Sequence, residues 1–132
     1  MPMTKPCSGQ IKYLIAIKEL SESLGTVKCV NISRHLGVSR PSVSKMLRCL
    51  ANSGLVFDDF CNSVELTEEG ETAVNEIFSV FSEIYIFFRR FLHVPAEEAH
   101  KQAVDFITQF PNETCVSLKE LVGRTLRKKS SQ

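Results

Sequence analysis

Residues 30–47 read VNISRHLGVSRPSVSKML, a pattern that predicts two short helices joined by a tight turn. Asn31 can cap the first helix, and Gly37 can end it because glycine readily adopts the left-handed conformation that follows a helix. Ser39 can cap the second helix, with Pro41 in the first turn, where a missing N–H loses no hydrogen bond. The segment therefore predicts a helix-turn-helix.

The flanking sequence extends this motif to a winged helix-turn-helix. Upstream, apolar residues recur at helical spacing over residues 11–24. Downstream, the segments Leu55-Val56-Phe57 and Val64-Glu65-Leu66 flank the polar stretch 58–63, which predicts two short antiparallel strands, the wing. In a helix-turn-helix protein, the second helix of the motif enters the major groove of DNA.

A long helix is predicted next, from Thr67 to Leu92, with apolar residues on two of its sides. One small domain cannot bury both sides, so we expect a contact with a second copy of the chain. Two more helices are predicted over residues 95–110 and 112–126. The residues expected in the dimer contact are Phe81, Ile84, Tyr85, Phe87, Phe88 and Phe91.

The predicted fold class is mainly α with a small β-hairpin. A chain of 132 residues can hold two small coupled domains. We expect a winged helix-turn-helix DNA-binding domain in residues 1–70 and an α-helical dimerisation domain in residues 71–126. Residues 127–132 are expected to form a basic, frayed tail.

Composition is typical of a globular protein and excludes several other classes. With 43% hydrophobic and 23% charged residues, wholesale disorder is excluded. Arg89 and Arg90 interrupt the longest apolar run, which is too short to span a membrane, and the N-terminus lacks the apolar core of a signal peptide. Five cysteines without CxxC spacing predict reduced thiols. We therefore expect a cytoplasmic protein without a membrane partner.

Charge is distributed unevenly along the chain. Residues 1–50 contain eight Lys and Arg residues against two acidic ones, whereas residues 51–100 contain two basic residues against ten acidic ones. This asymmetry favours a polyanion such as double-stranded DNA as the partner of the first half. Chance segregation of charge is the alternative.

The helix-turn-helix segment closely resembles the DNA-binding helices of the diphtheria-toxin-repressor/manganese-transport-regulator family of metal-dependent bacterial repressors. The sequence Leu66-Thr67-Glu68-Glu69-Gly70 is similar to the wing exit of that family, and the similarity covers about residues 8–122. The resemblance implies a homodimeric transcriptional repressor bound to an inverted repeat, with a winged-helix domain followed by a helical dimerisation domain.

The resemblance also indicates which residues lie at or near DNA. Arg40 and Lys45 could donate to guanine or phosphate, and Pro41 could touch a thymine methyl. For any single residue, a solvated helix surface is the alternative. The full candidate set is Lys28, Ser39, Arg40, Pro41, Ser42, Ser44, Lys45 and Arg48.

The resemblance further implies a manganese or iron sensor, but the ligand positions differ in this chain. On an ungapped alignment those positions hold Lys12, Ile15, Ser82, Val104, Ile107 and Thr108. None of these side chains is a strong transition-metal ligand, so we expect no metal cofactor. A relocated site could use Glu97, His100 and Asp105, although surface side chains on a polar helix face are the simpler interpretation.

Three alternatives stay open beside this interpretation. An enzyme is disfavoured because the chain has no Gly-rich phosphate loop and only three scattered histidines. A winged-helix protein-interaction module without DNA binding is the stronger rival. A thiol sensor is the third alternative, with Cys29 and Cys49 flanking the motif; we expect Cys49 to be buried and Cys61 to be the exposed redox candidate.

Overall fold

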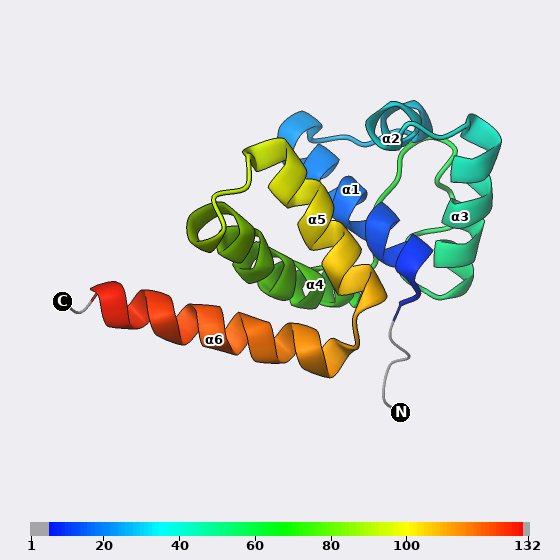
Figure 1. Cartoon of the computed structure of the whole chain (residues 1–132). Coiled ribbons are helices and arrows are strands. Elements are labelled where there is room, and N and C mark those ends of the chain that lie inside the picture. The colour runs from blue at the N-terminus through cyan, green and yellow to red at the C-terminus, as the bar shows by residue number, and fades with distance from the viewer. Residues whose placement is uncertain (1–5, 131–132) are drawn as a thin grey trace. The chain divides into compact units, whose positions relative to one another are not determined.

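The computed structural model describes the backbone of residues 6–130 and side chains through residue 128, and most of that length is helical (Figure 1). The elements are α1 (Ser8–Leu24), α2 (Cys29–Leu36), α3 (Arg40–Asn52), α4 (Glu68–Ile86), the π-helix η1 (Phe87–Phe91), α5 (Ala96–Gln109) and α6 (Asn112–Ser130). The chain divides into two compact units between Glu76 and Ile77, inside α4. In the described part, no helix is both long and apolar enough to cross a membrane.

The core of the first unit lies where the apolar faces of α1, α2 and α3 meet. Burial of these faces is the main favourable contribution to folding, since apolar area removed from water contributes about 25 cal/mol per Å². The same positions recur at helical spacing in the sequence, so periodicity alone locates this core. Its fully buried side chains include Leu14, Ile17, Ile32, Val43, Leu47 and Leu50.

The turn between α2 and α3 confirms the predicted helix-turn-helix. Gly37 ends α2 in the left-handed conformation, with φ of 66°. The hydroxyl oxygen of Ser39 caps α3 by accepting a hydrogen bond from the backbone N–H of Ser42 at 3.3 Å. Asn31 does not precede α2 as predicted but lies in its first turn. From there its side-chain oxygen accepts a hydrogen bond from the backbone N–H of Lys28 at 2.8 Å.

The predicted β-hairpin is not confirmed: in the described residues it is reduced to one isolated antiparallel bridge between Val56 and Leu66. The backbone N–H of Val64 does not bond to the opposite segment of the predicted hairpin but donates to the carbonyl of Val27, just before α2. Phe60 is buried at 4% exposure. Residues 58–63, which we call the wing loop, therefore fold back onto the first unit instead of projecting as a two-stranded ribbon.

The predicted long helix changes its winding in the second unit. The α-helical part ends at Ile86, and η1 continues the chain with a backbone hydrogen bond of 3.3 Å from the N–H of Leu92 to the carbonyl of Phe87. The ring centroid of Phe87 lies 5.6 Å from those of Phe88 and of Phe91. Adjacent aromatic residues thus pack together at the turn where the winding widens.

The helices α5 and α6 complete the second unit. Ala99 and Ala103 are fully buried on α5, where small side chains allow close approach of a neighbouring element. Cys115 of α6 is buried, and its thiol lies 3.9 Å from the carbonyl oxygen of Phe106. The helix α6 extends to Ser130, past the predicted end at residue 126. Of the predicted basic tail, residues 131–132 lie outside the described part, as do residues 1–5 of the predicted first domain.

Candidate nucleic-acid interface

The helix α3 has one buried face and one exposed face. Val43, Leu47 and Leu50 are fully buried, which fixes the orientation of the helix in the first unit. Spacings of three and four residues place these side chains on one stripe, so the positions between them face outward. The predicted contact residues on that exposed face are Arg40, Pro41, Ser42, Ser44, Lys45 and Arg48, and Ser39 and Lys28 are exposed beside it.

The N-terminal end of α3 favours anions. Its first turn contains no acidic residue and begins with Arg40. The hydroxyl oxygens of Ser39 and Ser42 lie 2.8 Å apart, within hydrogen-bond distance. The helix dipole makes this end electrostatically positive, and the guanidinium of Arg40 adds to this. The electrostatics of this end therefore favour an anion.

Arg48 is held in place by the wing loop. Its guanidinium carbon lies 4.9 Å from the centroid of the Phe60 ring, a cation–π arrangement. Phe60 is itself buried, so the ring is a fixed support for the cation. The sequence indicated Arg48 as a candidate contact but contained no signal for this pairing, because residues 48 and 60 belong to different elements.

The ion pairs of the first unit leave the α3 cations available. Lys18 pairs with Glu22 at 3.5 Å on α1, and Glu19 lies 3.7 Å from the His35 imidazole. Within the described residues, neither of these pairs uses a cation of α3. The outer face of this helix therefore carries three of the eight basic residues of the first half of the chain, Arg40, Lys45 and Arg48.

One cysteine prediction is wrong. Cys49 is exposed, not buried, because it lies between the buried positions Leu47 and Leu50 and falls just outside the apolar stripe of α3. Gln10, a buried amide that the sequence did not single out, donates to the Ser53 hydroxyl at 3.1 Å and lies 3.6 Å from the Cys49 sulfur. This amide links the start of α1 to the end of α3.

The six predicted dimer residues differ in burial. Phe81 and Ile84 are already buried in a single chain, and Phe81 packs edge-on against the His100 ring at 5.2 Å. These two side chains have little surface to offer a second subunit. The four that are half-buried and keep accessible ring surface are Tyr85, Phe87, Phe88 and Phe91.

The residues that the resemblance aligns with family metal ligands can be placed in the structure. Ile15 and Ile107 are buried hydrocarbons, and Lys12 is exposed and cationic. In the described part of the chain, no three His, Cys, Asp or Glu side chains gather as a group that could hold a metal ion. The fallback residues Glu97, His100 and Asp105 therefore do not converge.

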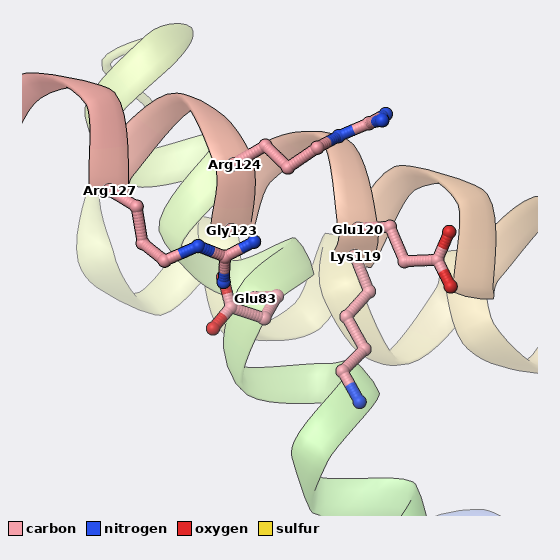
Figure 2. Close-up of a pocket in the computed structure, with 6 residues that line it drawn as sticks. All are labelled: Glu83, Lys119, Glu120, Gly123, Arg124 and Arg127. Atoms are coloured by element: carbon pink, nitrogen blue, oxygen red, sulfur yellow. The ribbon is translucent and has the colours of Figure 1, made fainter.

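A pocket of about 330 Å³, lined mainly by charged residues, lies in the second unit (Figure 2). Glu83 of α4 contributes one wall, and its carboxylate oxygen Oε2 is buried without a hydrogen-bond partner among the described residues. Figure 2 shows Arg127 reaching toward Glu83, whereas Arg124 points away from it. The remaining lining residues are Lys119, Glu120 and Gly123. The sequence did not predict this pocket.

Known proteins share the helix-turn-helix part of this chain. Residues 11–58 match the family model for the iron dependent repressor, N-terminal DNA binding domain. The predicted resemblance is confirmed. The transcriptional regulator MntR of Escherichia coli O6:H1 is 39% identical over 64 residues, which cover 48% of this chain and 41% of that protein. MntR of Salmonella typhimurium is 38% identical over the same share of each chain.

These curated relatives are transcriptional regulators and not enzymes. The match spans less than half the length of the curated relatives. Among solved structures, the manganese regulator SloR has a TM-score of 0.73 at 25% identity, covering 91% of this chain and 55% of that one. IdeR of T. acidophilum has a TM-score of 0.72 at 24% identity, covering 86% and 53%, and so shares the fold.

Proposed function

We propose that this chain is a transcriptional repressor that binds double-stranded DNA as a homodimer at an inverted repeat. One observation carries the proposal: residues 11–58 match a repressor DNA-binding domain, and in that segment α3 exposes Arg40, Lys45 and Arg48 on one face. A helix with this exposed cationic face suits the major groove, where Arg and Lys read guanine and neutralise phosphates. Ser42, Ser44 and Pro41 add short contacts to the same face.

The two parts of the chain have separate roles in this proposal. Residues 1–70 bind DNA, and residues 71–126 dimerise. Support for dimerisation comes from the aromatic rings that stay partly exposed on η1 and just before it. Of the six residues expected in the dimer contact, four remain in the proposal: Tyr85, Phe87, Phe88 and Phe91.

A footprinting experiment tests the proposal. Two recognition helices related by a two-fold axis meet major grooves about 34 Å apart, or a multiple of that spacing, so a symmetric footprint over two half-sites is expected. Protection of a single half-site by a monomer would contradict it. A gel shift with random duplex at low salt separates this proposal from the protein-interaction module, because only a DNA-binding protein has salt-dependent affinity for nonspecific duplex.

Replacing Lys45 by alanine is expected to weaken operator binding by about 1 to 3 kcal/mol, roughly 5- to 150-fold. If Lys45 reads a base, preference at one position of each half-site relaxes as well. If it contacts phosphate, affinity falls equally for all sequences and the salt slope drops by about one. Fluorescence anisotropy at several salt concentrations distinguishes these results. Lys18→Ala is the matched control, because that lysine pairs with Glu22 on α1.

The regulator is also proposed to work without the manganese or iron of its relatives. Support comes from the chemistry at the corresponding positions, since Ile15 and Ile107 are buried hydrocarbons that offer no lone pair to a metal. The exposed ammonium group of Lys12 repels cations. These residues do not fit the metal that the family implies.

Operator affinity is therefore expected to change by less than about twofold between excess chelator and added manganese or ferrous ion. A ligand shifts a conformational equilibrium only through different affinities for its two states. Anisotropy in the two conditions measures this, with magnesium at equal concentration as a control for screening of the DNA charge. Affinity that collapses in chelator and returns with manganese would overturn the prediction. The fallback residues Glu97, His100 and Asp105 would then be the first to substitute.

A further inference from the structure

Two of the cysteines meet where the wing loop lies against the start of α2. The thiol of Cys29, the first residue of α2, donates to the carbonyl oxygen of Phe60 at 3.6 Å. Cys61 is the next residue in the loop, and peptide geometry places its Cα about 3 Å from that oxygen. The Cys29 sulfur therefore lies within about 7 Å of the Cα of Cys61, so the two cysteines are neighbours across the start of α2 and the wing loop.

Both cysteines are held by neighbouring contacts. The N–H of Val64 donates to the carbonyl of Val27 at 2.8 Å and ties the end of the wing loop to the residues just before α2. The buried ring of Phe60, which supports Arg48, ties the middle of the loop to α3. The approach of the two cysteines is thus built into the packing of the first unit.

The two thiols differ in accessibility. Cys61 is exposed, whereas Cys29 is half-buried. Burial raises the pKa of the Cys29 thiol, and the nearby Cys61 raises it further, while the helix backbone and Arg40 lower it. An oxidant in solution reaches Cys61 first, and Cys29 is placed to react second.

We propose that Cys29 and Cys61 form a dithiol that a peroxide oxidises to a disulfide across α2 and the wing loop. The Cys61 thiolate attacks one peroxide oxygen, the O–O bond breaks, and the second oxygen leaves as water after protonation, so that Cys61 becomes a sulfenic acid. In a second step the Cys29 sulfur attacks the Cys61 sulfur and gives up its proton. The S–O bond breaks, and the departing hydroxyl group takes that proton and leaves as a second water. The two thiols supply the two electrons that reduce the peroxide.

The site lies in the unit proposed to bind DNA, but its chemistry does not depend on that function. Arg40, a proposed DNA contact, is close enough to Cys29 to influence its ionisation. The remaining cysteines provide internal comparisons: Cys7 and Cys49 are exposed, and Cys115 is buried in the second unit. Accessibility alone would therefore favour Cys49 or Cys7 over Cys29 as the partner of Cys61.

The test treats the reduced full-length chain with one equivalent of hydrogen peroxide and alkylates the remaining thiols. Trypsin combined with a protease that cleaves before aspartate places all five cysteines on different peptides. Cleavage after Lys28, after Arg48 and before Asp59 separates Cys29, Cys49 and Cys61 from one another. Mass spectrometry without reductant is expected to find the linked Cys29–Cys61 peptides at least about tenfold above any other pair. Reduction should release both peptides.

Two variants complete the experiment. Cys29→Ser is expected to leave Cys61 as a sulfenic acid that dimedone traps, because the second thiol is missing. Cys49→Ser, the matched control at an exposed position, is expected to form as much Cys29–Cys61 disulfide as the unmodified chain. Circular dichroism checks that both variants fold. Pairing of Cys61 with Cys49 or Cys7, or overoxidation of Cys61 in the unmodified chain while Cys29 is still alkylated, would overturn the proposal.

Discussion

Replacing Gly70 by alanine is expected to destabilise the first unit by about 3 kcal/mol, near the upper end of the usual cost of overpacking. A Cβ at residue 70 would overlap the backbone carbonyl oxygen of Leu55 and lie 2.9 Å from its carbonyl carbon. The backbone cannot rotate aside as a side chain can, because the same carbonyl accepts the N–H of Thr67 at 3.1 Å. Thermal unfolding should show a midpoint lowered on the order of 10 °C.

Gly123→Ala is the matched control for this substitution. A Cβ there would meet only the flexible guanidinium of Arg127, at 3.4 Å. Both glycines are helical, and alanine is favoured over glycine in a helix by about 1 kcal/mol. The control should therefore keep or raise the midpoint. Equal midpoints for Gly70→Ala and the unmodified chain would show that α4 can move away from Leu55 at little cost.

Phe87→Asp is expected to dissociate the proposed dimer at micromolar concentration. The ring of Phe87 is half-buried against Phe88 and Phe91, and a second subunit would cover the rest of it. A carboxylate in that apolar contact would lose its hydration without gaining a partner, a penalty of several kcal/mol. A loss of about 3 kcal/mol weakens dimerisation more than a hundredfold. Sedimentation velocity measures the change directly.

Phe57→Asp serves as the control for this experiment. Phe57 is 49% exposed and belongs to the first unit, so the same chemical change there should leave the dimer intact. Circular dichroism must show native helix content in both variants. If Phe87→Asp sediments as a dimer, another element carries the subunit contact.

The parts of the fold that were correctly predicted from sequence depend on local rules. Gly37 and Ser39 end and begin helices through interactions within a few residues, and the stripe of α3 follows from helical periodicity. That stripe also separates the exposed candidate contacts from the core. The candidate surface could therefore be predicted from the sequence almost in full.

The features that were missed depend on contacts distant in sequence. The hairpin is reduced to one bridge because the N–H of Val64 bonds to the carbonyl of Val27 and the ring of Phe60 enters the core. The alternation of apolar and polar residues within 55–66 contains no information about these contacts. The approach of Cys29 to Cys61 has the same origin. Cys49 was misplaced by a smaller error, since a rotation of about 100° per residue separates it from the buried Leu50.

The contact between the Phe60 ring and Arg48 affects the conformational entropy that the Arg48 side chain would lose on binding DNA. A free arginine has many rotamers, and immobilising such a side chain on binding costs about 0.5 to 1.5 kcal/mol. In this chain the cation–π contact at 4.9 Å restricts those rotamers before any duplex arrives. In the proposed DNA complex, part of the cost of ordering Arg48 would then be met during folding. Phe60 would consequently tune DNA affinity without touching DNA, so natural variation at this wing-loop position would change operator strength while leaving operator sequence preference the same.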